Sequence, residues 1–117
     1  MASGSAAERY ARNWLEHRGL RFLQANYRCK AGELDLIMTE GECLVIVEVR
    51  YRRGKSHGGA LSSVTRTKQR RILQATRHLL QRHPALQRRP LRFDVVALTG
   101  AAGAVTVQWL RNAFDAS

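Results

Sequence analysis

Two apolar segments, residues 33–39 and 43–50, most constrain the fold of this chain, because only a short polar break separates them. Both segments alternate in polarity and are rich in β-branched and other apolar residues, which predicts two adjacent strands. A two-residue turn at Gly41-Glu42, with glycine in the first position, is typical of a type II′ turn. The two segments are therefore predicted to form a β-hairpin.

The register of this hairpin sorts its side chains onto two faces. Since alternate residues of a strand point to the same side, one face is apolar and comprises Leu34, Leu36, Met38, Val45, Val47 and Val49. On the other face the register places Asp35 directly opposite Glu48. It also places Glu33 opposite Arg50, which an ordinary cross-strand ion pair would explain.

The rest of the chain supplies two helices and three more strands. Ser5 and Glu8 match a capping box for a helix over residues 6–18, which Gly19 ends. Further strands are predicted at residues 20–27, 91–99 and 105–110, and a second amphipathic helix at 65–82. The order αβββαββ predicts an α/β fold, a single domain over residues 1–117 with a mixed central sheet flanked by helices.

The charge of the chain indicates its partner. Twenty Lys and Arg residues against nine Asp and Glu give a net charge of +11, which suits a polyanion. Charge alone does not distinguish nucleic acid from an anionic membrane surface, but no stretch approaches the ~20 apolar residues of a spanning helix. Residues 1–7 also lack the pattern of a secretory signal. We therefore expect a cytoplasmic protein that binds nucleic acid, most simply DNA, and no membrane.

Asp35 and Glu48 form the candidate metal site. Like charges directly opposite each other in a hairpin are destabilising unless something offsets them, and a divalent cation would do so. Carboxylate oxygens, waters and a substrate phosphate together suit Mg²⁺ or Mn²⁺. Arg50 emerges on the same face as Glu48, two residues along the strand, where it can hold a phosphate.

Four motifs in this order carry a family resemblance: Gly32-Glu-Leu-Asp-Leu-Ile37, Val47-Glu-Val-Arg50, Thr67-Lys68 and Arg92-Phe-Asp94. They resemble the bacterial YraN family, which is similar to the archaeal Holliday-junction resolvases of the PD-(D/E)xK nuclease superfamily. The resemblance extends from Glu8 to Val96 and implies a restriction-endonuclease-like fold.

The resemblance also implies roles for single residues. Asp35 stands at the metal-binding aspartate, Glu48 at the acidic residue of the E-x-K pair, and Glu8 at the glutamate of the first helix. Glu8 has an equally good structural explanation in the capping box. Arg50 stands where lysine is usual, and an arginine stays charged and cannot act as a base. Lys68, which shares a helix face with apolar residues, leans toward the sheet and is the candidate to replace that lysine.

Basic residues on both sides of the motif are candidate nucleic-acid contacts. They comprise Arg52, Arg53 and Lys55 after the second hairpin strand, and Arg66, Lys68 and Arg70 at the start of the second helix. Most aromatic residues fall on apolar faces, and Tyr51 is the exception. Asp94 lies between apolar residues of a strand and is interpreted as a structural, hydrogen-bonded residue.

Two functions are compatible with these observations. The first is metal-dependent cleavage of phosphodiester bonds in structured DNA, with a resolvase-like homodimer implied by the resemblance alone. The second is a non-catalytic DNA- or RNA-binding module that retains the nuclease fold, with Arg50 marking lost or altered chemistry.

Overall fold

The computed structural model describes residues 2–52, 64–101 and 104–115. Within them the elements follow the predicted order αβββαββ, with one short 3₁₀ helix added after the second helix. They are α1 (Ala2–Glu16), β1 (Arg21–Cys29), β2 (Gly32–Glu40), β3 (Cys43–Arg52), α2 (Arg66–Arg82), η2 (Pro84–Arg88), β4 (Leu91–Ala101) and β5 (Ala104–Phe114).

The strands form one mixed five-stranded sheet in the order β1-β2-β3-β4-β5. Neighbouring strands are antiparallel except β3 and β4, which run parallel because α2 lies between them in the chain. The α/β fold with a mixed sheet is confirmed.

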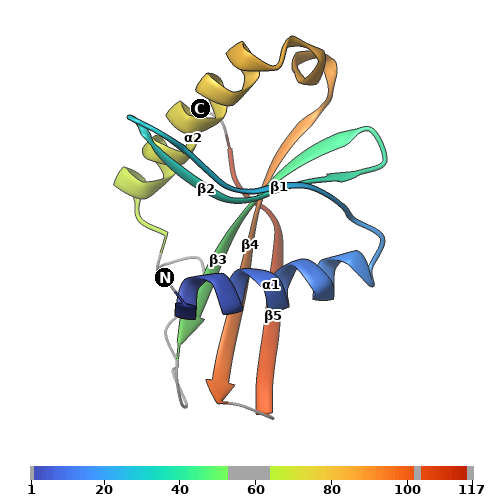
Figure 1. Cartoon of the computed structure of the whole chain (residues 1–117), viewed down its shortest axis with the longest axis vertical. Coiled ribbons are helices and arrows are strands. Elements are labelled where there is room, and N and C mark those ends of the chain that lie inside the picture. Colours follow the sequence, from blue (N-terminus) through green and yellow to red (C-terminus); the bar gives the residue numbers. More distant parts are fainter. Residues whose placement is uncertain (1, 53–63, 102–103, 116–117) are drawn as a thin grey trace.

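The two helices cover opposite faces of the sheet (Figure 1). On one face α1 packs over an apolar cluster that includes Leu36, Met38 and Val96. On the other face α2 buries Ile72, Ala75, Thr76 and Leu79. The helical spacing of these four residues explains why α2 lies with one side on the sheet and leaves its arginines outside.

The β2–β3 hairpin adopts the predicted register. Leu36 pairs with Val47 and Glu40 with Cys43, so the turn consists of Gly41 and Glu42. Gly41 has φ 59°, which the first position of a type II′ turn requires and which glycine adopts without strain. Because the side-chain period of a strand is two, this register decides which face every residue of the hairpin occupies.

One member of the predicted apolar face, Leu34, packs on the other side. It belongs to the cluster under α2, together with Tyr27 and Ile37, whereas Leu36 belongs to the cluster under α1. Asn26 of β1, which adopts φ 56°, lies next to this part of β2, between the pairs Tyr27–Leu34 and Ala25–Leu36. The simple alternation therefore fails at this point of the hairpin.

The start of α1 also differs from the prediction. The helix begins at Ala2, so Ser5 lies inside it and does not act as its N-cap. A cap contributes only about 1 kcal/mol, and the small residues before Ser5 extend the helix by a turn. Its end agrees better, because Gly19 has φ 100° and the Leu20 amide bonds back to the Leu15 carbonyl. In the parts of the chain described, neither helix is both long and apolar enough to cross a bilayer.

Candidate metal and phosphate site

A cleft of about 340 Å³ opens where β2 and β3 diverge, between the first turns of α1 and the beginning of α2. The last regular pair of the hairpin on this side is Leu36 with Val47. Asp35, just before this pair in β2, and Glu48, just after it in β3, therefore lie at the opening. The described residues that line the cleft are Ala7, Glu8, Glu33, Asp35, Glu48, Val49, Arg50, Tyr51 and Lys68. The structure thus brings together all four predicted catalytic residues and Lys68.

Asp35 and Glu48 enter the cleft from adjacent strands, next to the last regular pair of the ladder. Asp35 Oδ2 accepts a hydrogen bond of 2.8 Å from the backbone amide of Val49. This bond holds the carboxylate of Asp35 against β3. Glu48 is only 5% exposed and Asp35 is half-buried, so both acids have limited contact with water.

These surroundings disfavour the charged form of Asp35. Burial, followed by the negative charge of Glu48, raises the pKa of Asp35 from 3.8 to about 7. The Val49 amide and the charge of Lys68 act in the opposite direction and only partly compensate. A carboxyl group with a raised pKa, placed beside a second carboxyl group in a cleft, is typical of a functional site.

Glu48 is in contact with two cations. Lys68 Nζ lies 3.0 Å from Glu48 Oε2, and Arg50 Nη1 lies 3.4 Å from the same oxygen. Lys68 reaches the site from the first turn of α2, as its position on the inner side of that helix predicted. Lys68 therefore supplies an ammonium group from α2, which follows β3 in the sequence. Arg50 supplies a guanidinium group from the Val47–Arg50 motif itself.

Glu8 faces the same cleft from α1. Burial, with the charge of Asp35 as the next cause, raises the pKa of Glu8 above its usual range. Within the described ranges no three His, Cys, Asp or Glu side chains come together as a ready set of metal ligands. The geometry therefore makes Asp35 and Glu48 the two candidate ligands and places Glu8 beside them.

The predicted nucleic-acid contacts divide into two groups. Arg52 at the end of β3, and Arg66 and Arg70 in the first turns of α2, are exposed near the elements that form the cleft. Arg53 and Lys55 lie outside the described residues. Glu33 contacts Arg28 at 3.9 Å on the surface of the β1–β2 hairpin.

Sequence reasoning missed Asn26. This residue lies across from Asp35 in the gap between two regular pairs, and its side chain donates a hydrogen bond that lowers the pKa of Glu8. The signal was present, because asparagine is disfavoured in strands and is one of the few residues that adopt positive φ. An asparagine inside a predicted strand is therefore a signal that the backbone is irregular at that position.

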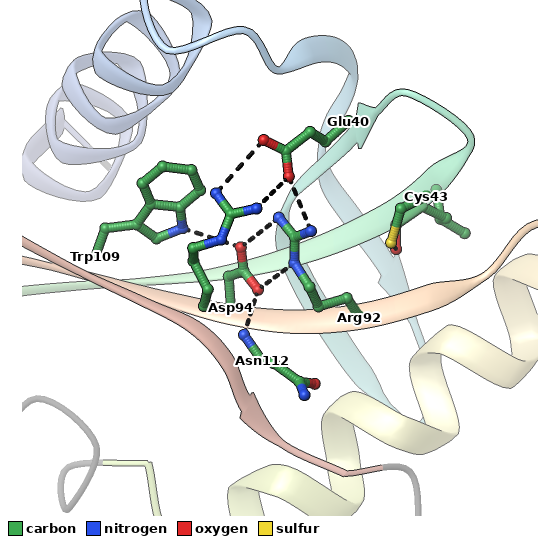
Figure 2. Close-up of polar contacts among 8 residues, drawn as sticks. Glu40, Cys43, Arg92, Asp94, Trp109 and Asn112 are labelled. Atoms are coloured by element: carbon green, nitrogen blue, oxygen red, sulfur yellow. Dashed lines mark hydrogen bonds and ion pairs between the residues drawn. The ribbon is translucent and has the colours of Figure 1, made fainter.

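Asp94 belongs to a separate buried network, as predicted (Figure 2). It is 1% exposed and accepts hydrogen bonds from Arg92 Nε at 2.9 Å, Trp109 Nε1 at 2.9 Å and the Asn112 amide at 2.8 Å. Arg92 also contacts Glu40 at 2.9 Å. Arg92 Nη2 donates a further hydrogen bond of 3.0 Å, so four donor atoms from β4 and β5 satisfy this carboxylate and explain its burial by structure alone.

Comparison with known proteins agrees with the family resemblance. Residues 7–98 match the family described as "Uncharacterised protein family UPF0102". The chain is 50% identical over 111 residues to a UPF0102 protein of Nitrosococcus oceani, covering 95% of this chain and 90% of that protein. It is also 50% identical over 114 residues to the UPF0102 protein YraN of Escherichia coli, covering 97% of this chain and 84% of the relative. The chain therefore belongs to the UPF0102 family.

Proposed function

We propose that this protein is a metal-dependent endonuclease that hydrolyses phosphodiester bonds in structured DNA. The observation that carries the proposal is the position of Lys68, whose ammonium lies 3.0 Å from Glu48 in the cleft that also holds Asp35. The residue types of a PD-(D/E)xK site, two acids and a lysine, are thereby present together, although arginine occupies the motif position itself.

The donor set fits a divalent cation. Asp35 and Glu48 provide hard oxygen ligands on adjacent strands, and their mutual repulsion is visible in the raised pKa of Asp35. A cation such as Mg²⁺ or Mn²⁺ would relieve this repulsion. When bound, it supplies an activated water and neutralises charge that develops on the phosphate.

The remaining side chains have complementary roles in the proposal. The guanidinium of Arg50 can hold a phosphate with two parallel hydrogen bonds. Lys68 is 44% exposed, so its ammonium can exchange the contact with Glu48 for one with a substrate phosphate or water. The exposed Arg52, Arg66 and Arg70 extend the positive surface beyond the cleft, which supports binding to a long polyanion.

The proposal is tested by cleavage of a four-way DNA junction, of a duplex with a single-stranded flap and of linear duplex, each with Mg²⁺ or Mn²⁺. Asp35→Asn keeps the acceptor for the Val49 amide, and Glu48→Gln keeps the side-chain shape, so each removes a charge with little change in packing. We expect each to reduce the cleavage rate by about 100-fold or more. Glu42→Gln, in the exposed hairpin turn, is the matched control and should cleave like wild type.

The location of the lysine provides a second test. Lys68→Ala should reduce cleavage, and adding Arg50→Lys to that variant should restore part of it by returning a lysine to the motif position. Junction cleavage that survives both Asp35→Asn and Glu48→Gln would exclude the proposed site. Tight DNA binding without cleavage in any variant or metal would instead support a non-catalytic binding module.

A further inference from the structure

Tyr51 is an aromatic residue at the wall of the cleft with no role in the site described above. It follows Arg50 at the end of β3 and is 44% exposed. Among the described residues that line the cleft, Tyr51 is the aromatic one. An aromatic side chain that only fills a hydrophobic core is normally buried, so the exposure of this ring beside charged groups points to another role.

The ring of Tyr51 is held in place by its hydroxyl group. Tyr51 Oη donates a hydrogen bond of 3.0 Å to the carbonyl oxygen of Gly100, near the end of β4. Gly100 has φ 125°, and a Cβ at this position would collide with the carbonyl of Ala104, so the backbone that carries the acceptor is tightly constrained. The anchor restricts the ring before any ligand arrives, which lowers the entropic cost of binding against it.

The cleft also places cations near the ring. Arg50 precedes Tyr51 directly, and Lys68 lines the same cleft. A nucleotide carries a flat base and a phosphate separated by one sugar, so a site for it needs an aromatic face and a cation within a short distance. Sites for single-stranded nucleic acid combine these two features, stacking bases on aromatic rings while basic side chains hold the backbone.

We propose that Tyr51 is a stacking platform for an unpaired nucleobase adjacent to the phosphate held in the cleft. This inference rests on the proposed function and narrows its substrate to DNA with an unpaired nucleotide at the cleavage point, such as a flap, gap or strand end. A base inside a regular duplex is already stacked on both faces, so it cannot lie on the ring without leaving the helix.

The test uses DNA in which 2-aminopurine, a base whose fluorescence falls on stacking, replaces each unpaired base of a flap in turn. Binding is measured without a divalent cation, so that no strand is cut. Wild type should quench the probe at one unpaired position, and not in the same sequence as a full duplex. Tyr51→Leu should abolish this quenching and weaken binding to the flap by about 5- to 100-fold, with duplex binding unchanged.

Two further variants separate stacking from a structural role. Tyr51→Trp retains an aromatic face and should retain the quenching even if Tyr51→Leu proves unstable. Tyr10→Leu is the matched control, because Tyr10 is also 44% exposed but does not line the cleft, and it should behave like wild type.

The outcomes are distinguishable. Flap binding without quenching at any position would overturn the stacking inference and leave the proposed function intact. An equal loss of flap and duplex binding in Tyr51→Leu would also overturn it, since that result indicates a structural role. Failure of wild type to bind any DNA would overturn both proposals.

Discussion

Asp35 is a carboxyl group whose surroundings oppose its charge, and this has a consequence for stability. Its pKa is 3.8 in an unfolded chain and about 7 in the folded protein, so the folded state binds the proton more tightly. The free energy of unfolding should therefore fall as the pH rises through this interval and stay level above it. Asp35→Asn cannot ionise, and it should exceed wild type in stability at about pH 8 by on the order of 1 to 4 kcal/mol.

Urea unfolding of both proteins at several pH values checks this expectation. Below about pH 4 the two should have similar stability, because Asp35 is then protonated in both states. Mg²⁺ or Mn²⁺ at about pH 8 should stabilise wild type and leave Asp35→Asn nearly unchanged, since ligands bind metal in the deprotonated form. A stability difference independent of pH would contradict the raised pKa.

The sequence predicted the central residues of the site because the periods of strands and helices determine which side chains share a face. Once Gly41 and Glu42 formed the turn, the strand period placed Asp35 across from Glu48, and helical spacing aimed Lys68 at the sheet. The sequence did not predict the positive φ of Asn26. A positive φ in a strand depends on what the tertiary structure requires at that position, and strand propensity alone does not reveal it.

At the scale of elements, the beginning of α2 positions Lys68. Thr65 is the N-cap, and its Oγ1 accepts a hydrogen bond of 3.2 Å from the Lys68 amide. Thr65→Ala should lower the free energy of unfolding by about 1 kcal/mol and weaken flap or junction binding, because the first turn of α2 then frays. Thr65→Ser keeps the acceptor and should remain close to wild type in urea unfolding and in binding.

The network around Asp94 connects β4 and β5, and its loss should be more costly. Removing the carboxylate leaves the indole nitrogen of Trp109 and the amide of Asn112 without this acceptor, and Arg92, which is 15% exposed, keeps only its contact with Glu40 among those described above. Asp94→Ala should therefore destabilise the fold by about 3 to 5 kcal/mol. Asp115→Ala, at an exposed position just after β5, should change stability by less than about 0.5 kcal/mol. A small effect of Asp94→Ala in thermal unfolding would show that the network is dispensable.

The elements themselves were predictable, and their details were less so. Long periodic segments gave the order αβββαββ and the register of the hairpin. The predicted start of α1 and the predicted side of Leu34 were wrong, because local sequence preferences do not fix the exact end of a helix or the side that a single strand residue occupies. Two partners of Asp94, Trp109 and Asn112, lie 15 and 18 residues further along the chain, and pattern reasoning does not specify such contacts.

For the whole molecule, the net charge of +11 should make DNA binding strongly dependent on salt. With six or more phosphate contacts, affinity should fall about 1000-fold between about 50 and about 200 mM salt. Arg66→Ala, near the cleft, should reduce the slope of log affinity against log salt by about 1. Arg88→Ala removes the same charge beyond the far end of α2 and should leave the slope unchanged. Equal slopes for all three proteins would mean that the charge acts without a defined binding face.

The outer strands β1 and β5 each contain an asparagine with positive φ, Asn26 at 56° and Asn112 at 52°, close to a shift in register. A straight, regular outer strand offers free amides and carbonyls that a strand of another molecule can join, which leads to aggregation. A kink at such a position disrupts the regular row of amides and carbonyls to which another strand would bind. Each asparagine thus shortens the straight stretch of its outer strand that a strand of another molecule could join.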